Sequence, residues 1–303
     1  MMAPLVDARL LRVIRPHIVA GGILGYLVGA LFSLNLGGGF SWTRFALGYL
    51  AVLFMDLSTH YNNDYYDVEL DRHAPFKPFG SVNLFIEHPE LRGSAFLAAV
   101  GFSALSLLIA SAMVLMGSSW QLLAVVALFN VLGWLYSAPP VKLHSRRLGE
   151  ATIAIGTGFC VPAVGYIAAQ GGIDGAFLLF SAPLVLYGFV LSLCLQMPDL
   201  ETDQALGKMT LVGLMGRRRS YLLVLLSSVA ASAFYFILLP RTGVFWAMPL
   251  VSLAPVVSSL LSVLLLNDSQ AHARLFTKIN VSALFLLLIG LDSALLLGLM
   301  NIS

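Results

Sequence analysis

The sequence predicts an all-α, polytopic membrane protein. Hydrophobic residues make up 59% of the 303 positions and charged residues only 11%, whereas an ordinary soluble domain carries roughly 25% charged residues. The apolar residues are gathered in long runs, and a helix of about 20 such residues crosses the hydrocarbon core of a bilayer. Cys160 and Cys194 both fall inside these runs, so neither a disulfide framework nor a cysteine-rich metal site is expected.

Nine apolar segments are long enough to be spanning helices. We expect them at residues 16–34, 45–61, 93–116, 119–136, 150–170, 174–196, 219–239, 245–266 and 279–300. Because Arg9, Arg12 and Arg15 precede a first run of full length, that run is expected to remain as a spanning helix and not to be a cleaved signal peptide. Residues 1–303 are then expected to form a single transmembrane domain.

The connections between these segments alternate in kind. Those after the first, third, fifth and seventh are short, whereas those after the second, fourth, sixth and eighth are longer and charged. With the N-terminus on the side of the charged connections, that side holds 15 of the 17 Lys and Arg residues, and only Arg44 and Arg241 lie opposite. The positive-inside rule then predicts a cell-membrane protein with a cytoplasmic N-terminus and an external C-terminus. The charged segments 62–92 and 197–218 are expected to cap the cytoplasmic face.

An acidic stretch follows the second span. Residues 63–71 read Asn-Asp-Tyr-Tyr-Asp-Val-Glu-Leu-Asp, so Asp64, Asp67 and Asp71 would share one stripe of a helix with Asn63 beside them. Like charges at this spacing repel unless a cation lies among them, and Mg²⁺ prefers such oxygen ligands. The alternative is a solvated helix end, where acids are ordinary.

A second acidic step follows the sixth span. Pro198 suits the start of a short helix, on which Asp199 and Asp203 lie one turn apart. The two motifs are four spans apart, which suggests two parallel four-helix repeats about an axis along the membrane normal. The motifs would then face each other across a central cavity and hold a pair of Mg²⁺ ions bridged by a substrate phosphate.

Basic residues on the same side of the membrane are candidate diphosphate ligands, because Lys and Arg donate to phosphate oxygens. They are Arg72, Lys77, Lys142, Arg146 and Lys208. The alternative for each is a charge that serves topology alone. The basic run 217–219 suits lipid headgroups better than nucleic acid, so no nucleic-acid partner is expected.

Further polar residues lie within or next to the spans. Tyr136 and Ser137 end the fourth span, where they can line a pocket below the phosphate, although an interfacial Tyr often belongs only to the aromatic belt. Asp56 lies eight residues before Asp64, about 12 Å deeper on a helix, and can face the same cavity. Acids inside a membrane are usually functional, but the sequence indicates no partner for Asp292.

These motifs together resemble those of the UbiA superfamily of intramembrane prenyltransferases. The resemblance rests on Asn-Asp-x-x-Asp-x-x-x-Asp after the second span, Asp-x-x-x-Asp after the sixth, the Tyr-Ser-x-Pro-Pro turn between them and the nine spans. It covers essentially the whole chain. Many members follow the first motif with Arg-Pro-x-x-Ser-Gly, whereas this chain has Lys77-Pro-Phe-Gly-Ser81.

The resemblance implies a fold, a site and an activity. The helices would surround a cavity that opens sideways to lipid, and Asn63, Asp64, Asp67, Asp71, Asp199 and Asp203 would bind a prenyl diphosphate through Mg²⁺. The reaction would pass through an allylic carbocation and prenylate an aromatic acceptor of the quinone-precursor type, or a lipid. A secondary transporter is the alternative, since repeats and intramembrane acids suit it equally, although its acids would be expected at the midplane.

Overall fold

The computed structural model describes residues 7–73, 84–238 and 243–302, and these form helices and no strand. Helices labelled η are 3₁₀ helices, except that η4 is a π-helical turn. In chain order the elements are η1 (Ala8–Val13), α1 (Pro16–Asn35), α2 (Trp42–Tyr66), α3 (Val68–His73), α4 (Leu84–Glu87), η2 (Pro89–Leu91), α5 (Arg92–Leu115), α6 (Gln121–Ser137), η3 (Leu143–Ser145), α7 (Gly149–Ile155), η4 (Gly156–Cys160), α8 (Val161–Gln170), α9 (Gly175–Gln196), η5 (Met197–Asp199), α10 (Leu200–Ala205), α11 (Leu211–Leu238), η6 (Gly243–Trp246), α12 (Ala247–Val251), α13 (Leu253–Leu264) and α14 (Gln270–Ile302).

Seven helical segments of the described chain are long and apolar enough to cross a membrane. They are Pro16–Asn35, Pro89–Leu115, Gly149–Gln170, Gly175–Ala205, Leu211–Ile237, Ala247–Leu264 and Gln270–Met300. Of the other two expected spans, α2 has 25 residues but ends in polar turns, and α6 has only 17 residues. The all-α membrane fold is therefore confirmed, while the count of nine spans and the four-helix repeat stay predictions.

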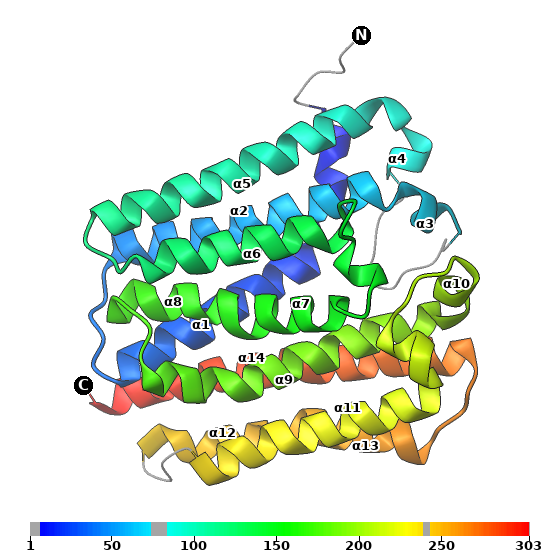
Figure 1. The fold of residues 1–303 in the computed structure, drawn as a ribbon. Coiled ribbons are helices and arrows are strands. Elements are labelled where there is room, and N and C mark those ends of the chain that lie inside the picture. Colours follow the sequence, from blue (N-terminus) through cyan, green and yellow to red (C-terminus); the bar gives the residue numbers. More distant parts are fainter. Residues whose placement is uncertain (1–6, 74–83, 239–242, 303) are drawn as a thin grey trace.

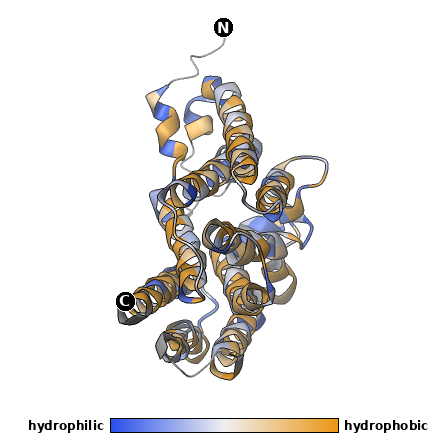
Figure 2. Ribbon diagram, turned by 90° about the vertical axis from the view of Figure 1, so that its left-hand side faces the viewer, coloured by the Kyte–Doolittle hydropathy of each residue, from blue (hydrophilic) through white to orange (hydrophobic). Residues whose placement is uncertain are grey.

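The long helices lie side by side with their ends gathered at two opposite faces (Figure 1). The segments with the acidic motifs, α3 and α10, lie at one end, and the C-terminus lies at the other. Figure 2 looks along the helices and shows them mostly in orange, with blue in η1 and in connecting segments. Large apolar side chains such as Leu115, Leu226 and Ile237 are exposed, as expected of surfaces that meet lipid.

Polar caps set where several helices begin. Ser269 accepts a hydrogen bond from the amide of His272 at 3.2 Å, and Thr210 accepts one from the amide of Gly213 at 2.9 Å. A side-chain oxygen at this position satisfies a backbone donor that the first turn leaves unpaired. Consequently α14 begins at Gln270 and α11 before the basic run, both earlier than the expected starts at 279 and 219.

Helices α1 and α8 cross in close contact through glycines. A Cβ on Gly29 would lie 1.9 Å from the carbonyl oxygen of Pro162, and one on Gly165 would lie 2.1 Å from that of Tyr26. Small residues let helix backbones approach in this way inside a membrane. The contact fixes one wall of the bundle next to the site described below.

Stacked rings fill the end of the bundle opposite the acids. Phe32, in the last turn of α1, stacks on Phe180 of α9 with ring centroids 3.8 Å apart. Tyr166 and Phe177 pack beside them at 4.8 Å. Since Phe32 lies about 24 Å along α1 from its first residue, this aromatic cluster packs α1, α8 and α9 together at the far end of the helices.

Candidate active site

A cavity of about 420 Å³ lies among α1, α2, α6, the α7–η4–α8 segment, α9 and α14. Its deeper walls are mainly apolar and aromatic. The polar end gathers residues from both acidic motifs, namely Asn63, Asp64, Asp67, Asp71 and Asp199. Two motifs far apart in the sequence therefore border the same space.

The first acidic motif is split between two helices. α2 ends at Tyr66, Asp67 is its C-cap, and the chain enters α3 directly afterwards. The amide of Asp71 donates to the carbonyl of Asp67 at 2.8 Å, so the step between the helices is short. Asp64, Asp67 and Asp71 therefore still line one cavity, although they do not share one continuous helix.

Cations and hydrogen-bond donors lie among these carboxylates. Arg15 forms an ion pair with Asp64, and their side chains are only 11% and 3% exposed. Asp67 accepts a hydrogen bond from the hydroxyl of Ser137 at 2.8 Å, and its carboxylate lies 3.4 Å from Nε2 of His144. These contacts offset the repulsion that neighbouring carboxylates would otherwise produce.

The second acidic motif lies on η5 and α10, and Pro198 is at the start of that turn as expected. Asp199 lines the cavity, while Asp203 is buried beside it and is not among the lining residues. Gly207 has a φ of +69°, which favours glycine, and it turns the chain back. The amide of Lys208 then donates to the carbonyl of Asp203 at 2.8 Å, and its Nζ lies 3.2 Å from the Asp203 carboxylate.

The candidate residues below the acids also meet the cavity or its ligands. Tyr136 lines the cavity, and its ring packs against His144 with centroids 5.3 Å apart. Ser137 is fully buried and reaches the cavity only through Asp67. Asp56 lines the deeper, apolar part. The fourth span and the second span therefore both contribute to one site.

Three expected diphosphate ligands lie outside the cavity. Arg72 pairs with Glu69 at 3.8 Å, Arg146 donates to a carbonyl of its own loop at 2.8 Å, and Lys142 is exposed. None of them lines the cavity, whereas Lys208 does. Lys77 lies outside the described residues. The role of these cations as diphosphate ligands stays a prediction.

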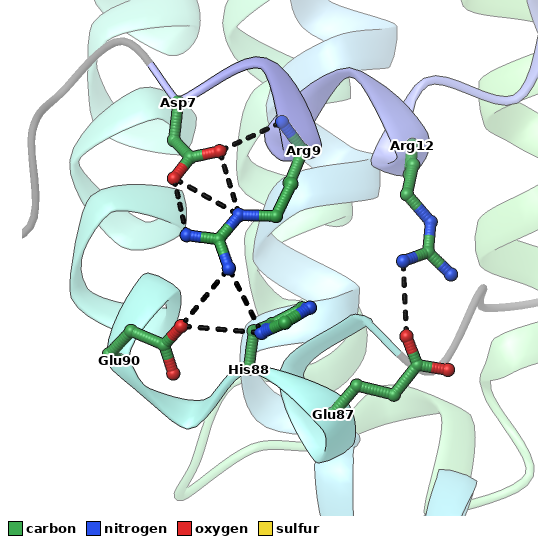
Figure 3. Close-up of polar contacts among 6 residues, drawn as sticks. All are labelled: Asp7, Arg9, Arg12, Glu87, His88 and Glu90. Carbon is green, nitrogen blue, oxygen red and sulfur yellow. Dashed lines mark hydrogen bonds and ion pairs between the residues drawn. The ribbon is translucent and has the colours of Figure 1, made fainter.

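The N-terminal helix η1 positions Arg15 at the cavity. Figure 3 shows the polar contacts that hold η1 against α4 and η2, which are made by Asp7, Arg9, Arg12, Glu87, His88 and Glu90. Hydrogen bonds from Arg9 lower the pKa of the Asp7 carboxyl to about 2. Leu10 is buried, and its carbonyl accepts a hydrogen bond from Tyr61 of α2 at 2.8 Å. Since η1 is anchored in this way, the position of Arg15 is fixed as well.

Among the cavity residues that the sequence did not indicate are one arginine and three histidines: Arg15, His17, His60 and His144. Arg15 precedes Pro16 at the start of the first span, on the side of the acids, and that position is the one signal that could have indicated it. No spacing singles out the histidines. Their convergence depends on how α1, α2 and the loop after α6 pack together.

The oxygens at the polar end suit a divalent cation. Asn63 Oδ1 is buried and has no hydrogen-bond partner among the described residues, which fits an oxygen that binds a metal. In this arrangement no three His, Cys, Asp or Glu side chains in the described part of the chain are placed to hold one ion. Arg15 and Lys208 instead pair with Asp64 and Asp203. Both pairs are made through Oδ1 of the carboxylate, and each carboxylate has a second oxygen that can bind a metal.

Comparison with known proteins gives a consistent result. The model of the UbiA prenyltransferase family matches residues 23–289. The 1,4-dihydroxy-2-naphthoate octaprenyltransferase of Bacillus subtilis (strain 168) is 24% identical over 235 residues, which are 76% of this chain and 72% of the relative.

Solved structures share the fold. A UbiA homolog from Aeropyrum pernix K1, in its apo form, has a TM-score of 0.72 and 17% identity, covering 91% of this chain and 98% of that one. A UbiA homolog from Archaeoglobus fulgidus bound to DMAPP and Mg²⁺ has a TM-score of 0.66 and 19% identity, covering 91% and 99%.

Proposed function

Because the chain belongs to the UbiA prenyltransferase family, we propose that it transfers a prenyl group from a prenyl diphosphate to an aromatic acceptor in a Mg²⁺-dependent reaction. The observation that carries this proposal is that both acidic motifs border one cavity with apolar walls. The chain is an integral membrane prenyltransferase, which decides against the secondary transporter.

The polar end of the cavity suits a diphosphate and divalent ions. The residues that would hold two Mg²⁺ ions are Asn63, Asp64, Asp67, Asp71, Asp199 and Asp203. When bound, Mg²⁺ neutralises charge that develops on a departing diphosphate. Arg15 and Lys208 add fixed positive charge at the same place, which stabilises that charge further. The similar Archaeoglobus structure with DMAPP and Mg²⁺ supports this choice of donor and metal.

The apolar part of the cavity suits an allylic carbocation. Departure of diphosphate with the electron pair of its C–O bond leaves positive charge on the prenyl carbon. Apolar walls keep water from that carbon. Faces of aromatic rings stabilise cations, and the cavity is lined by Phe129, Tyr136, Tyr187 and Phe285.

The acceptor is proposed from chemistry and from the relative's name. An electron-rich aromatic ring attacks the prenyl carbon and then loses a proton. The name of the Bacillus subtilis relative refers to a dihydroxynaphthoate, which supports an aromatic acceptor of the quinone-precursor type. A lipid acceptor is the second candidate, and the same assay distinguishes the two.

The proposal is tested with purified protein in detergent and labelled prenyl diphosphates of increasing length. The acceptors are 1,4-dihydroxy-2-naphthoate, other aromatic acids and glycerol-phosphate lipids. We expect prenylated naphthoate, loss of activity in EDTA and recovery with Mg²⁺. Asp64→Asn and Asp199→Asn should each lower the rate by about 100-fold or more, because ligands to the ions that stabilise the leaving group are removed.

Asp268→Asn is the matched control, because it makes the same substitution at an exposed acid that does not line the cavity. It should retain the wild-type rate, and thermal unfolding should show that all three variants are folded. Turnover of Asp64→Asn and Asp199→Asn within about tenfold of wild type, or full activity in EDTA, would contradict the proposed metal site.

A further inference from the structure

Asp56 places a carboxylate in the apolar part of the cavity. It belongs to α2, lines the cavity and is 9% exposed. No hydrogen bond or ion pair joins its side chain to any described residue. Burial of an unpaired carboxylate is costly, and intramembrane acids of this kind usually serve a ligand.

Helix α1 leaves room for this carboxylate. A Cβ on Gly22 would lie 2.5 Å from Asp56 Oδ2, which is too close for atoms that are not bonded. Gly21 and Gly25 line the same wall. The absence of side chains on this face of α1 therefore lets the Asp56 carboxylate lie at the wall of the cavity.

The stripe of α2 that begins at Asp56 leads to the first acidic motif. Thr59, His60 and Asn63 follow it along the cavity wall, and Asp64 is about 12 Å away along the helix axis. The hydroxyl of Thr59 donates to the carbonyl of Met55 at 3.0 Å. A molecule held between Asp56 and the acidic motif would thus meet a carboxylate at one end and the diphosphate site at the other.

An ionised carboxylate accepts hydrogen bonds and donates none. Among the groups of an aromatic acceptor, it attracts a hydroxyl and repels a carboxylate. This preference points to an acceptor whose ring hydroxyl is directed toward Asp56.

We propose that Asp56 binds a ring hydroxyl of the acceptor and takes its proton as the prenyl group is transferred. The proposal rests on the function proposed above. The C–O bond of the donor first breaks with its electron pair on diphosphate, and as the O–H proton then moves to Asp56, electrons of the ring form the new C–C bond to the prenyl cation. The substituted ring carbon then loses its proton to diphosphate, and Asp56 returns its proton to the ring oxygen.

The test compares 1,4-dihydroxy-2-naphthoate with its 1,4-dimethoxy analogue, which has no hydroxyl proton. Wild-type protein should prenylate and bind the dihydroxy compound in preference. Asp56→Asn should lower transfer to that compound by about 100-fold or more, because a general base is removed. Asp56→Asn should also reduce the ratio of the affinities for the dihydroxy and the dimethoxy compound, while the affinity for the prenyl diphosphate with Mg²⁺ stays unchanged.

One variant serves as a control, and another tests the position of the carboxylate. Asp292→Asn removes another carboxylate, in α14, that is equally buried but does not line the cavity, and it should keep the wild-type rate and preference. Gly22→Ala keeps the carboxylate of Asp56 but displaces it, and it should lower transfer with the donor affinity intact.

The inference is overturned if Asp56→Asn keeps both the wild-type rate and the wild-type preference for the dihydroxy compound. An equal loss in Asp292→Asn would also overturn it, because any buried acid would then have the same effect. If wild-type protein transfers no prenyl group to any aromatic acceptor, the proposed function fails instead. Binding of the two naphthoates is measured without turnover, so it tests Asp56 even in that case.

Discussion

A single hydroxyl supports the first acidic motif. The hydroxyl of Ser137 is fully buried outside the cavity and donates to the Asp67 carboxylate at 2.8 Å. It therefore orients Asp67, which is a proposed metal ligand. Loss of such a partner commonly costs about 10–100-fold in metal affinity or activity. We therefore expect Ser137→Ala to raise the Mg²⁺ concentration that gives half-maximal activity by about tenfold or more.

The control is Ser111→Ala on α5, whose hydroxyl donates only to the carbonyl of Leu107 within its own helix. It should leave the Mg²⁺ dependence unchanged. If Ser137→Ala lowers the maximal rate without any change in Mg²⁺ dependence, Ser137 does not act through a metal ligand.

Spacing marks the acidic residues of the site in the sequence, whereas Tyr136, Lys208 and Asp56 were expected from their positions next to or within the spans. The acids stand out because they recur at helical intervals after apolar runs, and five of the motif residues do line the cavity. Arg15 pairs with an acid 49 residues away, and that contact depends on the packing of α1 against α2. Arg72 is equally basic, but it forms an ion pair with Glu69 at the surface. Charge alone does not distinguish these two arginines.

An arginine ties the second acidic motif to its neighbouring helices. Arg217 is buried and follows Gly216, where α11 departs from helical geometry. Its guanidinium makes two hydrogen bonds of 2.6 Å to Glu201 of α10 and donates to the carbonyls of Met197 and Asp268 at 3.1 Å. Glu201 lies between the two acids of the motif, so this contact holds α10 in place.

Arg217→Ala should therefore lower the free energy of unfolding by about 2–3 kcal/mol, the usual cost of losing hydrogen bonds from a charged group. Hydrogen exchange of the amides in α10 should also become faster. Arg218→Ala is the matched control, because Arg218 is the next residue and its side chain is exposed. Equal effects of the two substitutions would exclude a special role for Arg217 in holding α10.

Helix positions were predicted well, but several ends were not. Hydropathy places the apolar middle of each helix, and this is why the expected segments coincide with long helices. Helix ends are decided by caps, so α14 begins nine residues before the expected start, at the position that Ser269 caps. The step from α2 to α3 at Asp67 has no signal in hydropathy either.

The whole molecule has a charge asymmetry that predicts its orientation. Of the 15 Lys and Arg residues in the described ranges, all but Arg44 belong to segments on the side of the acidic motifs, so that side should face the cytoplasm. Glu69 is exposed beside the first motif, and Gly175 is exposed at the opposite end of the helices. The native Cys160 and Cys194 are fully buried and should not react.

In intact cells, an impermeant maleimide should therefore label Gly175→Cys and not Glu69→Cys. Inverted vesicles should give the opposite pattern, since they expose the cytoplasmic face. A Cβ at residue 175 meets no other atom within 4 Å, so the substitution should not disturb the fold. Labelling of Glu69→Cys in intact cells would place the active site outside.

On α1 the cavity lining ends at Gly25, and the buried aromatic cluster of Phe32, Phe180, Tyr166 and Phe177 lies beyond it, toward the far end of the helices. A donor chain that is longer than the cavity would meet these rings. We therefore expect the end of such a chain to pass between helices into the surrounding bilayer. Additional isoprene units would then contact lipid and not protein. The rate should therefore depend on the allylic diphosphate end of the donor and change little with the length of its chain.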